Sequence, residues 1–278
     1  MRHFKNLVRP YLVWSFLIIV IPLFLIFMYA VTTNGNSLIN IQFTLDNFKR
    51  FFSDETFPKV VSRSLWIAVL TTVVCFLLGY PMAYFISKTN GKRKGLLVML
   101  VTIPMWINML VRTYALMGIL SDNGLLNSIL GVLGLPPVQI MYTDMAVMLG
   151  MVYDFLPFMV LQVYGSLEKM DASLLEAAAD LGADGVKTFL KVVFPLSIPG
   201  VLSGITLVFL PAVSSFFIPK LLGGGQYFLV GNLIENQFIT VGEWNFGSAI
   251  SMIMAIIMML MMMAVRKVEI HNQGGKEE

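Results

Sequence analysis

A polar segment opens with Glu176-Ala177-Ala178, reaches Gly182 after three further residues, and closes nine residues later with Val192-Val193-Phe194-Pro195. It lies between two long apolar runs. The alanines before Gly182 favour a helix, because an alanine side chain loses no rotamer freedom there. Gly182 is placed to end that helix in the left-handed conformation, which glycine adopts readily. The segment therefore predicts a short helix that stops at Gly182.

Capping residues extend this prediction to a helical hairpin. Ser173 and Glu176 have the spacing of a capping box, which pairs side chains with free backbone amides at a helix start. Asp184 can cap a second helix, which runs to Pro195, where the chain must turn back toward the apolar runs. Residues 166–196 are therefore expected to form a hairpin that projects into water.

The composition of the whole chain is that of a membrane protein. Of its 278 residues 57% are hydrophobic and 13% charged, and the mean hydropathy is +0.80. In soluble domains about 45–50% of the residues are hydrophobic and about 25% are charged. An all-α integral membrane protein is therefore expected, and soluble and disordered classes are excluded. The net charge of +3 offers no basic surface for nucleic acid.

The sequence lacks the residue clusters that carry chemistry. Its single cysteine, Cys75, lies in an apolar run, which excludes a disulfide framework and a cysteine-based metal cluster. The methionines that crowd residues 252–263 are expected to pack against protein or lipid rather than to bind copper. Neither a nucleophile beside a base nor a nucleotide-binding loop is present. We therefore expect no metal, no cofactor and no catalysis in this chain.

Six apolar runs are long enough to cross a bilayer, which takes about 20 helical residues. They cover about 11–31, 64–86, 96–117, 145–165, 197–218 and 248–265. Six crossings put both termini on one side. If that side is the cytoplasm, thirteen Lys and Arg residues lie inside and five outside, with Arg112 within a span, as the positive-inside rule favours. Residues 1–278 are thus expected to form one transmembrane domain with a cytoplasmic hairpin.

Short helices are also expected in the outer loops. Asp46 can cap one whose aromatic residues lie along the membrane interface. The stretch Gly124–Gly134 predicts a second, which Gly134 and two prolines end. Gly223–Gly225 predicts a plain turn, because the Lys-Ser or Lys-Thr of a phosphate-binding loop does not follow.

The polar hairpin resembles the EAA loop of ABC importer permeases, usually written E-A-A-x3-G-x9-I-x-L-P. Val192 stands for Ile and Phe194 for Leu, and both keep an apolar side chain. The resemblance implies the six-helix fold of type I ABC importer permeases, with both termini cytoplasmic. It also implies that the hairpin docks into a groove of an ATP-hydrolysing subunit. The residues that the resemblance assigns to this coupling are Glu176, Ala177, Ala178, Gly182 and Pro195.

The chain as a whole resembles the permeases of spermidine/putrescine importers. The stretches that carry this are Phe43–Asn47, Leu78–Pro81, Ile103–Trp106, Leu156–Met159, Leu175–Gly182, Val230–Ile234, Gln237-Phe238 and Phe246-Gly247. The resemblance implies a polyamine importer of the bacterial cytoplasmic membrane. Its other subunits are a second permease of the same fold, two ATPase subunits that bind ATP and magnesium, and an extracytoplasmic polyamine-binding protein.

Other functions remain as alternatives. The same importer class can carry another substrate, such as an organic anion, a metal chelate or an amino acid, because extracytoplasmic binding proteins usually set specificity. A self-contained channel or a membrane enzyme is a different class, and the E-A-A hairpin argues against both.

Two ionisable residues lie within the spans, Arg112 and Asp154. Asp154 follows Tyr153 and precedes Pro157, whose missing amide hydrogen is expected to loosen the fourth span. A carboxylate beside aromatic rings suits a translocating ammonium group. Asp154 can equally pair with Arg112 to keep the bundle in register, since an unpaired buried charge is costly. The sequence leaves both interpretations open.

Five further residues belong to the candidate substrate path. Trp106, Asn108 and Tyr114 share the third span with Arg112, where they either line a path or serve as interface anchors and interhelical contacts. Ser214 and Phe216 lie between two prolines of the fifth span, where the chain is expected to bend. The bend is either the pivot of a gate or a simple kink.

Overall fold

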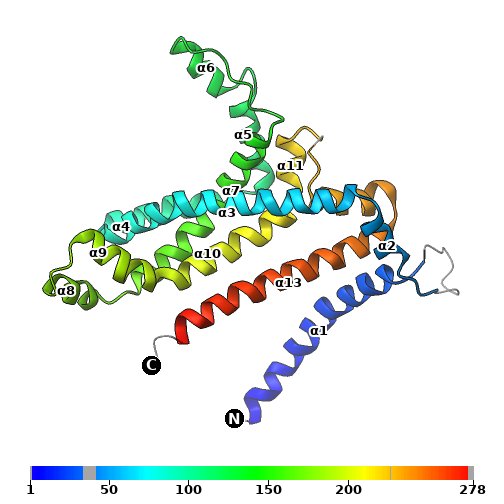
Figure 1. Cartoon of the computed structure of the whole chain (residues 1–278), viewed down its shortest axis with the longest axis horizontal. Coiled ribbons are helices and arrows are strands. Elements are labelled where there is room, and N and C mark those ends of the chain that lie inside the picture. Colours follow the sequence, from blue (N-terminus) through cyan, green and yellow to red (C-terminus); the bar gives the residue numbers. More distant parts are fainter. Residues whose placement is uncertain (1, 34–41, 226, 275–278) are drawn as a thin grey trace. The chain divides into compact units, whose positions relative to one another are not determined.

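The chain is helical throughout most of the part that the computed structural model describes, residues 2–33, 42–225 and 227–274 (Figure 1). Contacts divide it into a first unit, residues 1–61 with 233–260, and a second unit, residues 62–232 with 261–278. The α-helices and two π-helical segments (η) are α1 (Arg2–Ala30), α2 (Asp46–Ser53), α3 (Thr56–Lys88), α4 (Lys92–Trp106), α5 (Met109–Leu120), α6 (Leu125–Val132), α7 (Asp144–Glu168), α8 (Ala172–Asp180), α9 (Gly185–Thr188), η1 (Phe189–Val193), α10 (Phe194–Ser214), α11 (Phe217–Leu222), α12 (Val230–Glu235), η2 (Asn236–Val241) and α13 (Trp244–Gly274).

The helix boundaries confirm the all-α class, and four of the apolar helical stretches coincide with predicted spans. Six stretches are long and apolar enough to cross a membrane: Pro10–Ala30, Thr56–Lys88, Met109–Val132, Asp144–Glu168, Gly185–Ser214 and Trp244–Val268. The first, second, fourth and sixth contain or closely match the predicted ranges. The third and fifth differ from prediction. The cytoplasmic placement of the termini, which rests on charge bias, stays a prediction.

The prediction of a continuous third span over 96–117 is wrong. The chain leaves the helical conformation at Ile107, and α5 starts directly after Asn108. Asn108 explains the break, because its side chain accepts a hydrogen bond from the Leu110 amide at 2.8 Å and so caps a new helix. Pro104 also contributes, since it has no amide hydrogen for the helical ladder.

The predicted turn at Pro195 is also wrong, because the helical hairpin continues directly into the fifth apolar stretch. Segments α9, η1 and α10 form one helical stretch from Gly185 to Ser214. The π-helical turn η1 widens the helix just before Pro195, which accommodates the proline ring and its missing amide hydrogen. The bend expected between the two later prolines is present, since α10 ends at Ser214, Ser215 is extended and α11 starts at Phe217.

Two asparagines hold the first unit together at the end of α1. The Asn47 side-chain amide donates to the carbonyls of Ala30 and Thr32, both at 3.0 Å. The Asn245 amide donates to the carbonyls of Tyr29 and Thr32 at 3.0 and 2.8 Å. These bonds satisfy carbonyls that a helix end leaves unpaired. The apolar window of α1 itself has 0% of its residues buried, so this helix exposes apolar surface all round.

Helices α7 and α10 form the core of the second unit (Figure 1). Gly200 and Gly204, one turn apart on α10, allow the two helices to approach closely. A Cβ atom added at Gly200 would lie 2.5 Å from the Ser166 Cβ, and one at Gly204 would lie 2.6 Å from the Met159 sulfur. Small residues at this spacing are typical of closely packed membrane helices. Helix α7 itself is continuous through Pro157, so the predicted loosening does not interrupt it.

The two predicted outer-loop helices are present, one of them with a different cap. Helix α2 starts at Asp46, but its N-cap is Leu45, and the Asp46 amide donates to the Thr44 hydroxyl at 3.1 Å. The predicted Asp46 cap is therefore wrong, because Thr44 already closes this turn. Helix α6 matches its prediction, and Gly134 beyond it has a φ of +72°. Gly224, with a φ of +67°, lies in the predicted turn after α11.

Candidate functional site

The hairpin of α8 and α9 is joined at Gly182, as the sequence predicts. Gly182 has a φ of +75°, and the amides of Gly182 and Ala183 donate to the carbonyls of Ala179 and Ala178 at 2.9 and 3.0 Å. This arrangement is a Schellman motif, which satisfies the carbonyls at a helix end. A Cβ atom at position 182 would meet nothing within 4 Å. The backbone conformation alone therefore favours glycine here.

Aspartates start both helices of the hairpin. Asp184 caps α9 as predicted and accepts a hydrogen bond from the Lys187 amide at 2.7 Å. The predicted capping box of Ser173 and Glu176 is wrong, because Asp171 is the N-cap of α8 and accepts from the Ser173 amide at 2.9 Å. These backbone hydrogen bonds lower the pKa of both aspartates, since they stabilise the ionised carboxylate. Both caps are therefore charged at neutral pH.

The hairpin exposes apolar side chains beside the residues that the sequence resemblance assigns to coupling. Leu181 is 88% exposed and Val186 is 69% exposed. Glu176 and Ala177 are exposed as well, whereas Ala178 is buried against the hairpin and Pro195 is half-buried in the first turn of α10. Exposed apolar groups on a short helix are typical of a surface that docks into a groove of another protein.

An aromatic cluster, Tyr80, Tyr84, Phe189 and Phe194, attaches the base of the hairpin to α3. The ring of Phe189, at the start of η1, packs edge-on against Tyr80 and Tyr84, with centroids 5.8 and 5.4 Å apart. Phe194 lies 5.6 Å from Tyr80. The hydroxyls of Tyr80 and Ser197 are hydrogen-bonded at 2.8 Å. This cluster was not predicted from the sequence. It lies at a π-helical turn, η1, and such turns frequently mark functional sites.

Arg112 and Asp154 form a buried ion pair between α5 and α7. The Arg112 Nη1 atom lies 2.9 Å from the Asp154 Oδ1 atom, and the two side chains are 9% and 3% exposed. The geometry is not that of a hydrogen bond, so the contact is an ion pair without a directed donor. The structure thus shows the pairing that the sequence left as one of two alternatives.

The remaining aromatic and amide residues of the predicted path do not gather around this ion pair. Tyr153 and Trp106 line two different pockets. Trp106 is 87% exposed beside the helix break, and Tyr114 is exposed on α5. Asn108 has a structural task, because its side chain caps α5. A single acidic and aromatic site is therefore not formed by these residues in this conformation.

Contacts at the bend after α10 occupy the last two path residues. The Ser214 hydroxyl donates to the Leu210 carbonyl of its own helix at 3.1 Å. The Phe216 ring packs against Phe217 with centroids 4.1 Å apart, and its carbonyl accepts from the Asn232 side-chain amide at 2.8 Å. These bonds satisfy polar groups around the kink, which supports its interpretation as a structural bend.

A polar pocket of about 600 Å³ lies between α7, α10 and the start of α8, directly beside the hairpin. Gln162 and Ser166 of α7 and Ser203 of α10 line it, together with Lys169 and Asp171 at the hairpin. This pocket was not predicted from the sequence. Its signal was Gln162, a polar residue within an apolar span. Amide and hydroxyl groups around this space make it a candidate contact site for polar solutes.

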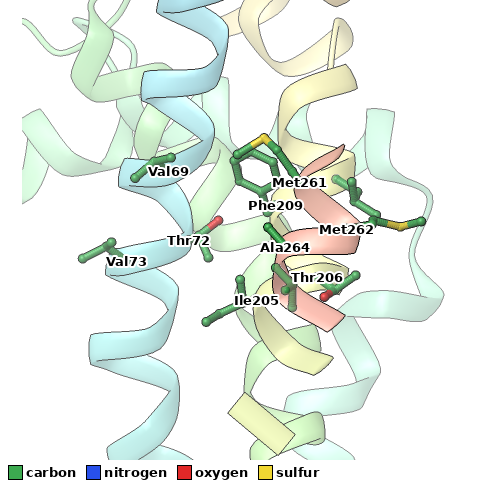
Figure 2. A pocket seen from close by; sticks show the side chains of 11 residues that line it. Val69, Thr72, Val73, Ile205, Thr206, Phe209, Met261, Met262 and Ala264 are labelled. Carbon is green, nitrogen blue, oxygen red and sulfur yellow. The ribbon is translucent and has the colours of Figure 1, made fainter. Parts of the chain in front are cut away.

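A second pocket, of about 340 Å³, lies between α3, α10 and α13. Figure 2 shows Thr72, Phe209 and Ala264, one from each helix, around the same space. The hydroxyls of Thr72 and Thr206 donate to carbonyls of their own helices at 2.7 and 2.9 Å, so they are not offered to a ligand. This pocket suits a hydrocarbon chain and does not suit a cation.

A further cluster, which was not predicted from the sequence, joins Arg63 of α3 to the first residue of α7. The Arg63 Nη2 atom lies 2.9 Å from the Asp144 Oδ1 atom, and its guanidinium lies 4.1 Å above the Tyr227 ring. Burial raises the pKa of Tyr227 above its usual value. Each residue stands beside an apolar run, but its partners are distant in sequence, so local patterns carry no signal for the cluster.

Comparison with known families decides what this helical chain is. Residues 75–268 match the family model described as binding-protein-dependent transport system inner membrane component. The chain belongs to this family of importer permeases. The permease is 42% identical over 253 residues to the spermidine/putrescine transport system permease protein PotB of Escherichia coli K12, covering 90% of the permease and 92% of PotB. It is 31% identical over 240 residues to the inner membrane ABC transporter permease protein YdcU of the same organism. This alignment covers 81% of the permease and 76% of YdcU.

A solved structure supports the same assignment of the fold. A chain of a bacterial ABC transporter that imports the acidic polysaccharide alginate matches the permease with a TM-score of 0.79 at 15% identity, over 96% and 98% of the two chains. The family, the importer permease fold and the multi-pass location in the inner membrane are thereby confirmed. The permeases of this family are transport components without catalysis of their own, so the prediction that this chain is not an enzyme is confirmed as well.

Proposed function

We propose that the permease is the subunit through which an ATP-driven importer moves spermidine and putrescine into the bacterial cytoplasm. The observation that carries this proposal is the 42% identity to PotB over 90% of the permease. This alignment covers nine-tenths of both chains, more than residues 75–268 that the family model matches. It therefore supports a shared substrate class more strongly than a shared fold does.

The second candidate is the same importer class with another solute. The alginate importer has this fold at 15% identity, so the fold accommodates substrates as different as a polysaccharide. Within the permease, Asp154 is engaged by Arg112 and the pocket of Figure 2 is apolar. These features support selection of the solute by an extracytoplasmic binding protein rather than by the permease.

The proposed assembly contains a second permease of the same fold, two ATPase subunits and an extracytoplasmic polyamine-binding protein. ATP and magnesium bind to the ATPase subunits, and this chain holds no cofactor. The exposed apolar residues Leu181 and Val186 support an ATPase partner, because such groups are costly in water unless another protein covers them. The unburied apolar helix α1 supports contacts with lipid or with the second permease.

In this proposal the hairpin transmits ATPase closure to the membrane helices. The Schellman turn at Gly182 and the aspartate caps give α8 a defined shape, so that it can move as a rigid element. The aromatic cluster connects η1 to α3, and η1 continues without a break into α10. A displacement of α8 therefore reaches two spans at once.

The experiment is reconstitution of the complete importer in liposomes, with uptake of labelled spermidine and putrescine and the ATPase rate measured together. Loaded binding protein outside is expected to raise the ATPase rate, because a partner shifts the permease toward the state that it binds better. Stimulation only by a binding protein that carries a different solute would retain the importer and reject polyamines. Polyamine flux through this chain without ATPase subunits would reject the importer mechanism itself.

A further inference from the structure

We propose that the permease binds an anionic phospholipid of the inner leaflet in a groove between α3 and α4. The groove has a volume of about 350 Å³, and residues of α7 form its floor. Its two walls are aliphatic and aromatic. The wall residues are Met82, Phe85 and Ile86 of α3 and Leu97, Leu100 and Val101 of α4.

The groove is open along its walls. Phe85 is 66% exposed and Leu100 is 53% exposed. Phe85 belongs to the second membrane span, and α4 runs antiparallel to it after the turn at Gly91. An open apolar groove at this depth faces hydrocarbon, and an acyl chain fills it without burying any polar group.

Basic residues stand at one end of the groove. Arg93 precedes Leu97 by four residues on α4, so it lies on the same helix face one turn further along. Lys88 ends α3, two residues beyond Ile86. Both side chains are exposed. The charge bias of the chain places this end at the cytoplasmic surface.

These charges are not neutralised within the part of the chain that the structure describes. The ion pairs found there include neither Lys88 nor Arg93. Glu168, a nearby carboxylate, is engaged by Lys94 at 3.0 Å. Lys88 lies 5.6 Å from the Tyr84 ring, on the side of α3 where Lys94 and Glu168 line a neighbouring pocket. The ends of α3 and α4 that adjoin the groove therefore carry two cationic groups that have no ion-pair partner among the described residues and are available to an external anion.

An apolar groove with basic residues at one end favours a phospholipid over a protein helix as the occupant. An anionic lipid of the cytoplasmic leaflet has a phosphate-bearing headgroup joined to acyl chains. Its headgroup would lie at the basic end, and an acyl chain would lie in the apolar groove. A partner helix would need an acidic residue at the matching height to neutralise the same two charges. The lipid needs no such coincidence.

The test uses the assembled importer in nanodiscs that contain a phosphatidylglycerol probe with a photoreactive group on its acyl chain. Crosslinked peptides are mapped by mass spectrometry, and a phosphatidylcholine probe with the same chain provides the comparison. We expect crosslinks at the walls of α3 and α4. Labelling by the phosphatidylglycerol probe should exceed that by the neutral probe by about 25-fold, since each of the two basic residues adds about 1 kcal/mol of attraction, or about fivefold in affinity.

Two variants separate the headgroup contact from the acyl contact. Lys88→Gln with Arg93→Gln should reduce groove labelling by the anionic probe to about that of the neutral one. Its matched control is Arg266→Gln with Lys267→Gln, which also removes one Lys and one Arg, from the exposed end of α13. Leu100→Trp should fill the groove and reduce labelling by both probes, whereas Leu96→Trp, on α4 but outside the groove lining, should not.

Three results would overturn the proposal. Equal groove labelling by the two probes would remove the headgroup contact. Unchanged labelling in the Lys88→Gln, Arg93→Gln variant would show that these cations do not hold the lipid. Absence of groove labelling in the complete importer, with labelling elsewhere on the spans, would show that a protein subunit covers the groove.

Discussion

Arg112 of α5 and Asp154 of α7 lie 2.9 Å apart, although 42 positions of the chain separate them. The pair joins the helix that restarts after the break at Asn108 to the central helix of the second unit. A lone charge within the bilayer is costly, so each residue is tolerated because the other is present. The pair therefore holds the broken third span against the core.

The first prediction concerns this ion pair. Asp154→Asn leaves Arg112 buried without a counter-charge, which is expected to cost about 3–5 kcal/mol. The midpoint of thermal unfolding of the purified importer should fall, and polyamine uptake should slow. The double variant Arg112→Gln, Asp154→Asn removes both charges and should recover most of the stability and the uptake. Recovery of stability without recovery of uptake would instead assign Asp154 to the substrate path.

The second prediction concerns Gly182. Gly182→Val places a branched side chain in the left-handed conformation. This strains the Schellman turn and should cost about 1–2 kcal/mol of the hairpin's stability. ATPase association, measured by co-purification, and stimulated ATPase activity should both decrease. The control is Gly185→Val in the same hairpin, since Gly185 has no positive φ and its added Cβ would meet nothing within 4 Å. Normal assembly and transport in Gly182→Val would reject the assignment.

The third prediction concerns the close contact of α7 and α10. Gly200→Leu places a side chain where even a Cβ would lie 2.5 Å from the Ser166 Cβ and 2.7 Å from the Gln162 carbonyl oxygen. Overpacking of this kind typically costs about 1–3 kcal/mol, so thermal stability should fall. Gly165→Ala on α7, where the new Cβ would meet nothing within 4 Å, should leave stability unchanged or raise it slightly. Equal effects of the two variants would contradict a tight helix contact.

The fourth prediction concerns the aromatic cluster. Phe189→Leu removes the ring that contacts both Tyr80 and Tyr84 and should loosen the connection between η1 and α3. We expect ATP hydrolysis to persist while the number of polyamine molecules moved per ATP falls several-fold. Phe189→Tyr keeps the ring and should retain the coupling ratio. Phe209→Leu, a buried aromatic of α10 outside the cluster, controls for general loss of packing. A coupling ratio unchanged by Phe189→Leu would leave the cluster with a structural role only.

Features that depend on a few neighbouring residues could be predicted from the sequence alone. The left-handed end at Gly182 and the cap at Asp184 depend on bonds within one turn, and the spans depend on continuous apolar length. Predictions from neighbouring residues were wrong where a different residue capped the helix. Asp171 replaced Ser173 as the cap of α8, and Asn108 started a new helix inside an apolar run.

The sequence by itself thus determined the membrane class, the course of most apolar helices, the helical hairpin around Gly182 and the importer family. Only the tertiary structure decided that Arg112 pairs with Asp154 and that Tyr80 bonds Ser197, 117 positions further on. The physical reason is that such contacts depend on how helices cross and which faces meet. Helical periodicity gives each residue a face but not a partner. The close approach of α7 to the small glycines of α10 is likewise decided only when both helices are packed.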